Sequence, residues 1–320
     1  LKIEGAVTAL LKDAIKPNLV QTLENTPVFI HGGPFANIAH GCNSVLATKM
    51  ALKLSDYVVT EAGFAADLGA EKFLDIKARK AEIEPNVIVI VATVRALKHH
   101  GGDTDLKSEN IETLKKGLVN LERHIESMQK YHIPVIVAIN KFITDTDAEI
   151  KEIEKFCNAK GVEVALCEIW EKGGEGGKEL VEKVMNAIEK NEKSDKKYTP
   201  LYDLNLSIEE KIEKIAKEIY GADGVNFAPK ALNNFKKYVE NGYDKLPICI
   251  SKTQKSLSDN PNLLGRPTGF TITINEVRLS AGAGFLVAMA GSIIDMPGLP
   301  RKPAAELIDI DENGVISGLF

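Results

Sequence analysis

Short apolar runs alternate along most of this chain with longer stretches of helical periodicity. The apolar runs are rich in Val and Ile, which is typical of strands buried on both faces of a parallel sheet. We expect such buried parallel strands at Val28–Ile30, Tyr57–Thr60, Val87–Val91, Ile133–Ile139 and Val162–Cys167. Further strands are predicted at Pro247–Ser251 and Phe285–Met289. Phe270–Arg278 alternates apolar and polar residues, which indicates an antiparallel or edge strand.

The helical stretches carry their apolar residues on one side. Ser108–Lys130 has the strongest pattern, because apolar residues recur at helical spacing from Ile111 to Met128. Ser207 is predicted to cap a helix, with Glu210 at the capping-box spacing. Further helices are expected at Ala6–Ile15, Val45–Leu54, Gly69–Ala81, Asp147–Lys160, Lys178–Lys190 and Lys230–Val239. Strands that alternate with helices predict an α/β fold, with layers of parallel sheet and helices on both faces.

Composition narrows the class of protein. The chain has 320 residues, of which 44% are hydrophobic and 27% charged, as in globular domains. A net charge of −5 gives no general attraction to nucleic acid or to an anionic membrane, and no apolar run is long enough to span a bilayer. The four cysteines do not follow metal-site spacing. We therefore expect free thiols in a reducing cytoplasm and no metal ligands.

Aromatic side chains follow two neighbouring predicted strands at their carboxyl ends, where parallel sheets bind ligands. Asn140-Lys141-Phe142 follows the fourth strand and is similar to the base-reading turn of GTPases. Ile143 stands where that turn requires an aspartate, so a guanine site is not expected. Trp170, the only tryptophan, is expected to end the next strand. Two rings at adjacent strand ends can sandwich a flat heterocycle; the alternative is that both rings belong to the core.

Glycine and polar groups gather where two earlier strands are predicted to end. His31-Gly32-Gly33-Pro34 is followed by Asn37 and His40. Donors beside glycine backbone suit a carboxylate or an acyl phosphate. The alternative is a capped helix start whose histidines are satisfied locally. In the next strand-end loop, Glu61 stands close to Phe64.

Positive charge is expected at the same sheet edge. Arg95, Lys98 and His99 follow the third predicted strand and suit a phosphate, although a solvated helix turn accounts for each of them equally well. The loop Lys172–Lys178 is close to a Walker A motif, but its glycine spacing is one residue short. Glu179 also replaces the Ser or Thr that the motif requires. A flexible loop is therefore favoured over a phosphate cradle.

Long ordered segments carry a family resemblance, namely Thr26–Asp75, Asn86–Gly102, Ile133–Ile150, Ala165–Gly177, Ser251–Ile272 and Leu279–Asp311. In them the sequence resembles formate–tetrahydrofolate ligase, also called formyltetrahydrofolate synthetase. The family places a P-loop ahead of this region, so we expect the chain to be the later part of the enzyme, with an upstream P-loop segment or chain as partner. The resemblance implies a multi-domain relative of P-loop NTPases. Its expected parts are a nucleotide and formyl-phosphate domain at 1–132, a pterin-binding domain at 133–206 and a C-terminal domain at 207–320.

The same resemblance implies a reaction and a site. Formate would be ligated to tetrahydrofolate with ATP and Mg²⁺, through formyl phosphate, by a cytoplasmic homotetramer of one-carbon metabolism. The implied catalytic residues are His31, Asn37, His40, Glu61 and Arg95, and the implied pterin-binding residues are Phe64, Phe142, Leu166 and Trp170. Phe142 and Trp170 match the two stacking aromatics of the family. The alternative function is a folate- or nucleotide-binding module without catalysis.

Overall fold

Three parallel strands form the first of two larger sheets in the computed structural model, which describes residues 2–291, 302–303 and 306–318. They are β3 (Ile88–Ala92), β4 (Val135–Asn140) and β5 (Glu163–Cys167), in the order β3-β4-β5. Their parallel registers confirm three of the predicted buried strands. The carboxyl ends of the three strands therefore lie at one edge of the sheet.

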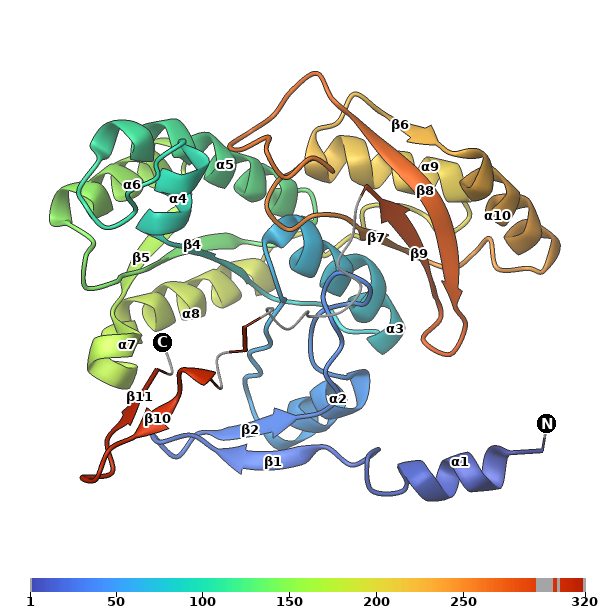
Figure 1. Ribbon diagram of the computed structural model, residues 1–320, viewed down its shortest axis with the longest axis horizontal. Helices are drawn as coiled ribbons and strands as arrows, with labels where there is room; N and C mark the ends of the chain where they lie inside the picture. The colour runs from blue at the N-terminus through green and yellow to red at the C-terminus, as the bar shows by residue number, and fades with distance from the viewer. Residues whose placement is uncertain (1, 292–301, 304–305, 319–320) are drawn as a thin grey trace.

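Helices cover both faces of this sheet (Figure 1). α4 (Val94–His100), α5 (Ile111–Gln129) and α6 (Asp147–Ala159) lie on one side, and α8 (Lys178–Glu192) lies on the other. The predicted apolar stripe of α5 is buried, and the Asn110 side chain caps its first turn. Between β5 and α8 lie the short helix α7 (Ile169–Lys172) and the 3-10 helix η3 (Gly173–Gly177). The predicted α/β class is confirmed.

The second sheet is mixed. Its order is β6 (Gly224–Phe227), β8 (Thr271–Ser280), β9 (Phe285–Ala290) and β7 (Ile248–Ser251). β8 pairs antiparallel with β9, as its alternating sequence predicted, and parallel with β6, so it lies inside the sheet. α9 (Ile208–Ile215), the π-helical turn η4 (Ala216–Tyr220) and α10 (Pro229–Glu240) accompany this sheet (Figure 1). The predicted capping box of Ser207 and Glu210 is present.

Two early loops, at residues 31–44 and 55–65, flank α2 (Val45–Leu54). A helical segment with two π-helical stretches connects them to the first sheet. It consists of η1 (Ala66–Ala70), η2 (Phe73–Ala78) and α3 (Arg79–Ala81). The predicted helix at Gly69–Ala81 is confirmed, but with wider turns than an α-helix, a form often found at functional sites. Five of its charged side chains are buried: Asp67, Glu71, Lys72, Asp75 and Lys77.

Two predicted buried parallel strands differ from the structure, because one is an exposed antiparallel strand and the other is not a strand. Val28–Ile30 belongs to β2 (Pro27–Ile30), which pairs antiparallel with β1 (Asn18–Gln21) in a largely exposed hairpin. Tyr57–Thr60 forms no strand, and Val59 is 97% exposed. Both runs are apolar, but periodicity cannot show whether a neighbouring strand pairs with a run this short.

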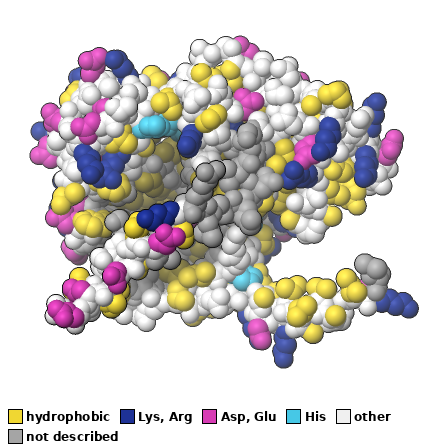
Figure 2. Space-filling model, viewed as in Figure 1, with side chains coloured by type: hydrophobic (Ala, Val, Ile, Leu, Met, Phe, Trp, Pro, Cys, Tyr) yellow, Lys and Arg dark blue, Asp and Glu magenta, His cyan; other side chains and the backbone are white. Residues whose placement is uncertain are grey.

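The first helix projects from the rest of the described chain (Figure 1). α1 (Glu4–Leu11) has no buried residue and ends before Ile15, where its prediction placed the end. Figure 2 shows hydrophobic side chains along this helix.

The remaining elements are small. α2 (Val45–Leu54) has the predicted bounds, and a small hairpin pairs β10 (Asp309–Ile310) with β11 (Ile316–Ser317). Within the described residues, no helix is both long and apolar enough to cross a membrane.

One apolar core cluster extends over elements of both larger sheets. The predicted boundary at 132–133 falls between β3 and β4, which pair along five residues. The boundary at 206–207 falls just before α9. The division into three domains stays a prediction.

Candidate functional site

A backbone hydrogen bond and an ion pair join the ends of β4 and β5. The Lys141 amide donates to the Cys167 carbonyl at 3.0 Å, and Lys141 Nζ forms an ion pair with Glu168 at 3.0 Å. The hydrogen bond to Glu168 raises the pKa of Lys141. Lys172 and Lys141 together lower the pKa of Glu168. Charged side chains with defined partners therefore lie at this edge of the sheet.

Arg95 and Phe142 meet at the same edge. The Arg95 guanidinium carbon lies 4.5 Å from the centroid of the Phe142 ring, a cation–π contact between α4 and the turn after β4. The Phe142 amide donates to Asp145 at 2.8 Å, which fixes the turn. Burial raises the pKa of Asp145. The structure thus brings together two residues that the sequence assigned to different roles.

Leu166 and Trp170 lie on the next strand and helix. Leu166 is half-buried in β5 and packs against the apolar core. Trp170 is 82% exposed. Its predicted position at the end of a strand is wrong, because the chain turns into α7 directly after Glu168. A large aromatic ring with this exposure is available for contact with a ligand.

Close backbone contact holds the two early loops against each other. The Gly63 amide donates to the Gly41 carbonyl at 2.8 Å, and a Cβ on Gly69 would lie 1.9 Å from the Gly63 carbonyl oxygen. Phe64 has a φ of 63° and packs edge-on against Phe35, with ring centroids 5.7 Å apart. A positive φ at a bulky residue is a strained conformation of the kind that clusters at functional sites. Phe64 is 43% exposed.

Two of the predicted catalytic residues make contacts that stabilise the fold. His31 Nδ1 hydrogen-bonds to Ser44 at 2.7 Å, and its Nε2 to the Ala14 carbonyl at 2.9 Å. Asn37 is buried, and its Oδ1 accepts from Ser251 at 3.2 Å and from the Lys252 amide at 3.1 Å. Asn37 therefore joins the early loop to the end of β7.

His40 and Glu61 have different surroundings. His40 Nδ1 is buried, with no hydrogen-bond partner among the described residues. Burial first, and then the charge of Lys77, lower the pKa of His40, so the imidazole is neutral. Glu61 is exposed.

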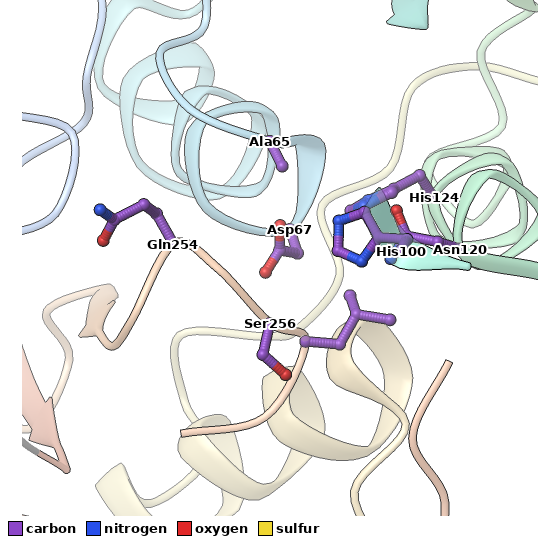
Figure 3. A pocket seen from close by; sticks show the side chains of 8 residues that line it. Ala65, Asp67, His100, Asn120, His124, Gln254 and Ser256 are labelled. Atoms are coloured by element: carbon purple, nitrogen blue, oxygen red, sulfur yellow. The ribbon is translucent and has the colours of Figure 1, made fainter. Parts of the chain in front are cut away.

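A small cavity of about 20 Å³ lies where the helical segment, α5 and the loop after β7 meet (Figure 3). Asp67 forms a buried ion pair with Lys252 at 2.7 Å. His124 Nδ1 is buried, and no described residue partners it. Burial lowers the pKa of His100 to about 4, and Gly265 donates its amide to His100 Nδ1 at 3.1 Å. This volume is about enough for one water molecule.

Sequence reasoning missed several of these groups. It did not single out His100, His124 or Lys77, because nothing in the sequence distinguishes a buried cation or imidazole on a helix from a solvated one. The ion pair of Asp67 with Lys252 joins residues 185 positions apart, the difference of their residue numbers. Only the fold brings them together.

The fold and these side chains define an α/β protein whose charged and aromatic groups gather at the carboxyl edge of a parallel sheet, the usual place for a ligand. The model of the family described as formate–tetrahydrofolate ligase matches residues 1–320. The chain therefore belongs to the formate–tetrahydrofolate ligase family, and it is a ligase of one-carbon metabolism. The family uses ATP and tetrahydrofolate as substrates.

Proposed function

We propose that this ligase works through formyl phosphate and that its pterin site lies at the β4–β5 edge. The observation that carries the proposal is the juxtaposition at that edge. Arg95 stacks on Phe142 after β4, and the exposed ring of Trp170 follows β5. A flat pterin would lie between Phe142 and Trp170, beside Leu166. Each aromatic stack contributes about 0.5–1.5 kcal/mol beyond the burial of apolar area.

The proposed reaction has two steps. A formate oxygen attacks the γ-phosphorus of ATP, and ADP leaves, which gives formyl phosphate. The N10 amine of tetrahydrofolate then attacks the formyl carbon, the carbon–oxygen bond to phosphate breaks, and the amine loses a proton. Protein groups accelerate such a sequence by holding the reactants together and by stabilising developing negative charge.

The predicted catalytic residues receive separate parts in this proposal. Arg95 holds Phe142 in place, and its guanidinium supplies positive charge at the sheet edge. His40 is the neutral donor of the early loop. We assign His31 and Asn37 to positioning, since their side chains form hydrogen bonds within the fold. Glu61 lies at the exposed rim of the same loops.

The remaining expectations concern groups beyond these side chains. Among the described residues, no three His, Cys, Asp or Glu side chains are placed to hold a metal ion, so we treat Mg²⁺ as part of the ATP substrate. Lys172–Lys178 folds into the end of α7, a 3-10 helix and the first residue of α8. The proposal therefore assigns the P-loop to a segment outside this sequence. A cytoplasmic homotetramer remains part of the proposal.

The direct test is formation of 10-formyltetrahydrofolate from formate, MgATP and tetrahydrofolate. The chain is assayed alone and together with a segment of the family that carries the P-loop. Product formed only with the added segment supports the proposal. If neither mixture forms product while both bind folate, the chain is a binding module and the proposal is wrong.

A further inference from the structure

Two lysines on one helical segment are fully buried but differ in their partners. Lys72 Nζ donates to the Ala36 carbonyl at 2.6 Å and to the Asn37 carbonyl at 3.1 Å. Lys77 Nζ has no oxygen acceptor among the described residues, and the weak acceptor beside it is the Cys42 thiol. Lys77 Nζ lies 5.0 Å from the centroid of the Phe73 ring. Burial lowers the pKa of Lys77, as expected for a buried amine that no described carboxylate neutralises, so a negative group beside it would stabilise the charged form.

The groups around Lys77 do not supply that negative charge. The buried Cys42 thiol interacts with Lys77 by charge and by a side-chain hydrogen bond, but burial raises the pKa of this thiol to about 11, so it is neutral and supplies no negative charge. Glu61 interacts with the ammonium electrostatically, but it is exposed and forms no ion pair with it within the described part of the chain. The charge of Lys77 also acts on His40, whose buried Nδ1 lacks a partner as well. Two buried nitrogen atoms that interact electrostatically thus have no oxygen acceptor or donor among the described residues.

We propose that Lys77 Nζ and the His40 imidazole bind a small oxyanion. An ammonium supplies a compact positive charge, and a neutral imidazole donates one N–H, which together match two oxygen atoms of a carboxylate or a phosphate. This inference rests on the proposed function, because formate and inorganic phosphate are respectively a reactant and a product of that reaction. Lys77 thereby becomes a substrate-binding residue that sequence reasoning did not identify.

The two buried lysines give a matched pair of variants. Lys72→Met leaves two carbonyl groups without a donor, so we expect its melting temperature to fall. Lys77→Met removes a buried amine for which the described part of the chain supplies no oxygen acceptor, so we expect its melting temperature in chloride to be unchanged or higher. Lys77→Met should also bind folate as the wild type does, measured by the fluorescence of Trp170.

Thermal unfolding in formate, phosphate or chloride at equal ionic strength tests the site. At a ligand concentration 100 times the dissociation constant, we expect the wild type to melt about 5 °C higher in at least one of the two oxyanions than in chloride. Lys77→Met should lose this shift and Lys72→Met should keep it. A response to formate alone identifies a carboxylate site, and a response to phosphate alone identifies a phosphate site; either supports the proposal.

Three results would overturn this inference. They are a wild type that melts alike in all three salts, a shift that persists in Lys77→Met, and a Glu61→Gln variant that loses stability in chloride because Glu61 is the true counter-ion. None of these affects folate binding. Failure of the wild type to bind folate would instead count against the proposed function and leave the oxyanion site standing.

Discussion

The guanidinium of Arg95 covers one face of the Phe142 ring at 4.5 Å. The residues come from different strand ends, α4 after β3 and the turn after β4, and the contact connects them across the edge of the sheet. A pterin at this edge would therefore meet the opposite face of Phe142. The arginine would then orient the ring from behind as well as supply positive charge.

Removing this arginine tests its part in ligand binding. We expect Arg95→Ala to weaken folate binding about fivefold, because the half-buried cation–π contact contributes roughly 1 kcal/mol to holding the ring in place. Lys160→Ala is the matched control, since Lys160 lies over the Phe156 ring at 5.8 Å, on a helix outside the proposed pterin site. Isothermal titration with folate measures both variants. Equal affinities for the two would contradict the role of Arg95.

The packing of the early loops depends on a glycine without a side chain. A Cβ at residue 69 would lie 1.9 Å from the Gly63 carbonyl oxygen, whereas one at residue 33 would meet nothing within 4 Å. We expect Gly69→Ala to reduce the free energy of unfolding by roughly 1–3 kcal/mol through overpacking. Gly33→Ala should unfold like the wild type in urea. Similar unfolding midpoints for the two variants would show that the loops pack differently.

A buried ion pair joins α4 to α6. Lys98 Nζ lies 3.0 Å from a carboxylate oxygen of Glu149, and both side chains are almost fully buried. Glu149 also accepts from the backbone amides of Asn110 and Thr146. We expect Glu149→Gln to lower the free energy of unfolding by about 3–5 kcal/mol, because the Lys98 ammonium is left buried without its counter-ion. Lys116→Gln, which breaks the exposed pair with Glu112, should leave the free energy of unfolding almost unchanged. Chemical denaturation compares the two.

Acid should destabilise the contacts around the small cavity. The unfolded His100 imidazole titrates near its ordinary pKa of 6.5, and burial, with the nearby His124 and His99, lowers the folded pKa to about 4. Between these values the unfolded chain binds a proton that the folded chain does not. Stability that is present above 6.5 is therefore lost as the pH falls towards 4. After allowance for solvent screening and for the opposing charge of Asp67, we expect the free energy of unfolding to fall by roughly 1–3 kcal/mol.

The comparison that isolates this histidine uses His100→Gln, which keeps an acceptor for the Gly265 amide. Urea midpoints of the wild type and the variant are measured from about pH 7 to about pH 4.5. As the pH falls, the urea midpoint of the wild type should decrease more than that of His100→Gln. A constant difference would mean that His100 takes up its proton equally in the folded and unfolded chain.

The fold was most predictable where long periodic segments decide the structure. The apolar stripe of α5 and the capping box of α9 are local patterns, and both were confirmed. The runs at Val28–Ile30 and Tyr57–Thr60 have the composition of strands, but composition does not show that the first pairs in an exposed hairpin and that the second forms no strand. β1, the partner of β2, is only four residues long and gave no recognisable period. Short elements of this kind are fixed by tertiary contacts.

The site was predictable in its aromatic part and much less so in its charged part. Phe142 and Trp170 stand out in the sequence because they follow strands, and the family resemblance gave them a role. Burial decides the character of Lys77. No periodicity in its neighbourhood shows that, among the described residues, its Nζ has no oxygen acceptor while that of Lys72 has two. The contact of Arg95 with Phe142 depends on the relative placement of two strand ends, which only the folded sheet supplies.

The most direct measurement of the central claim is a titration of this chain with tetrahydrofolate, monitored by tryptophan fluorescence. Trp170 is the only tryptophan and its ring is 82% exposed, so the emission comes from the proposed pterin site alone. We predict saturable quenching that Phe142→Ala weakens by about tenfold, in line with the loss of one aromatic stack. Tyr57→Ala, which removes an exposed ring outside the sheet edge, should leave the titration unchanged. Saturable folate binding without any change in Trp170 emission, or with equal affinity in Phe142→Ala, would contradict the account.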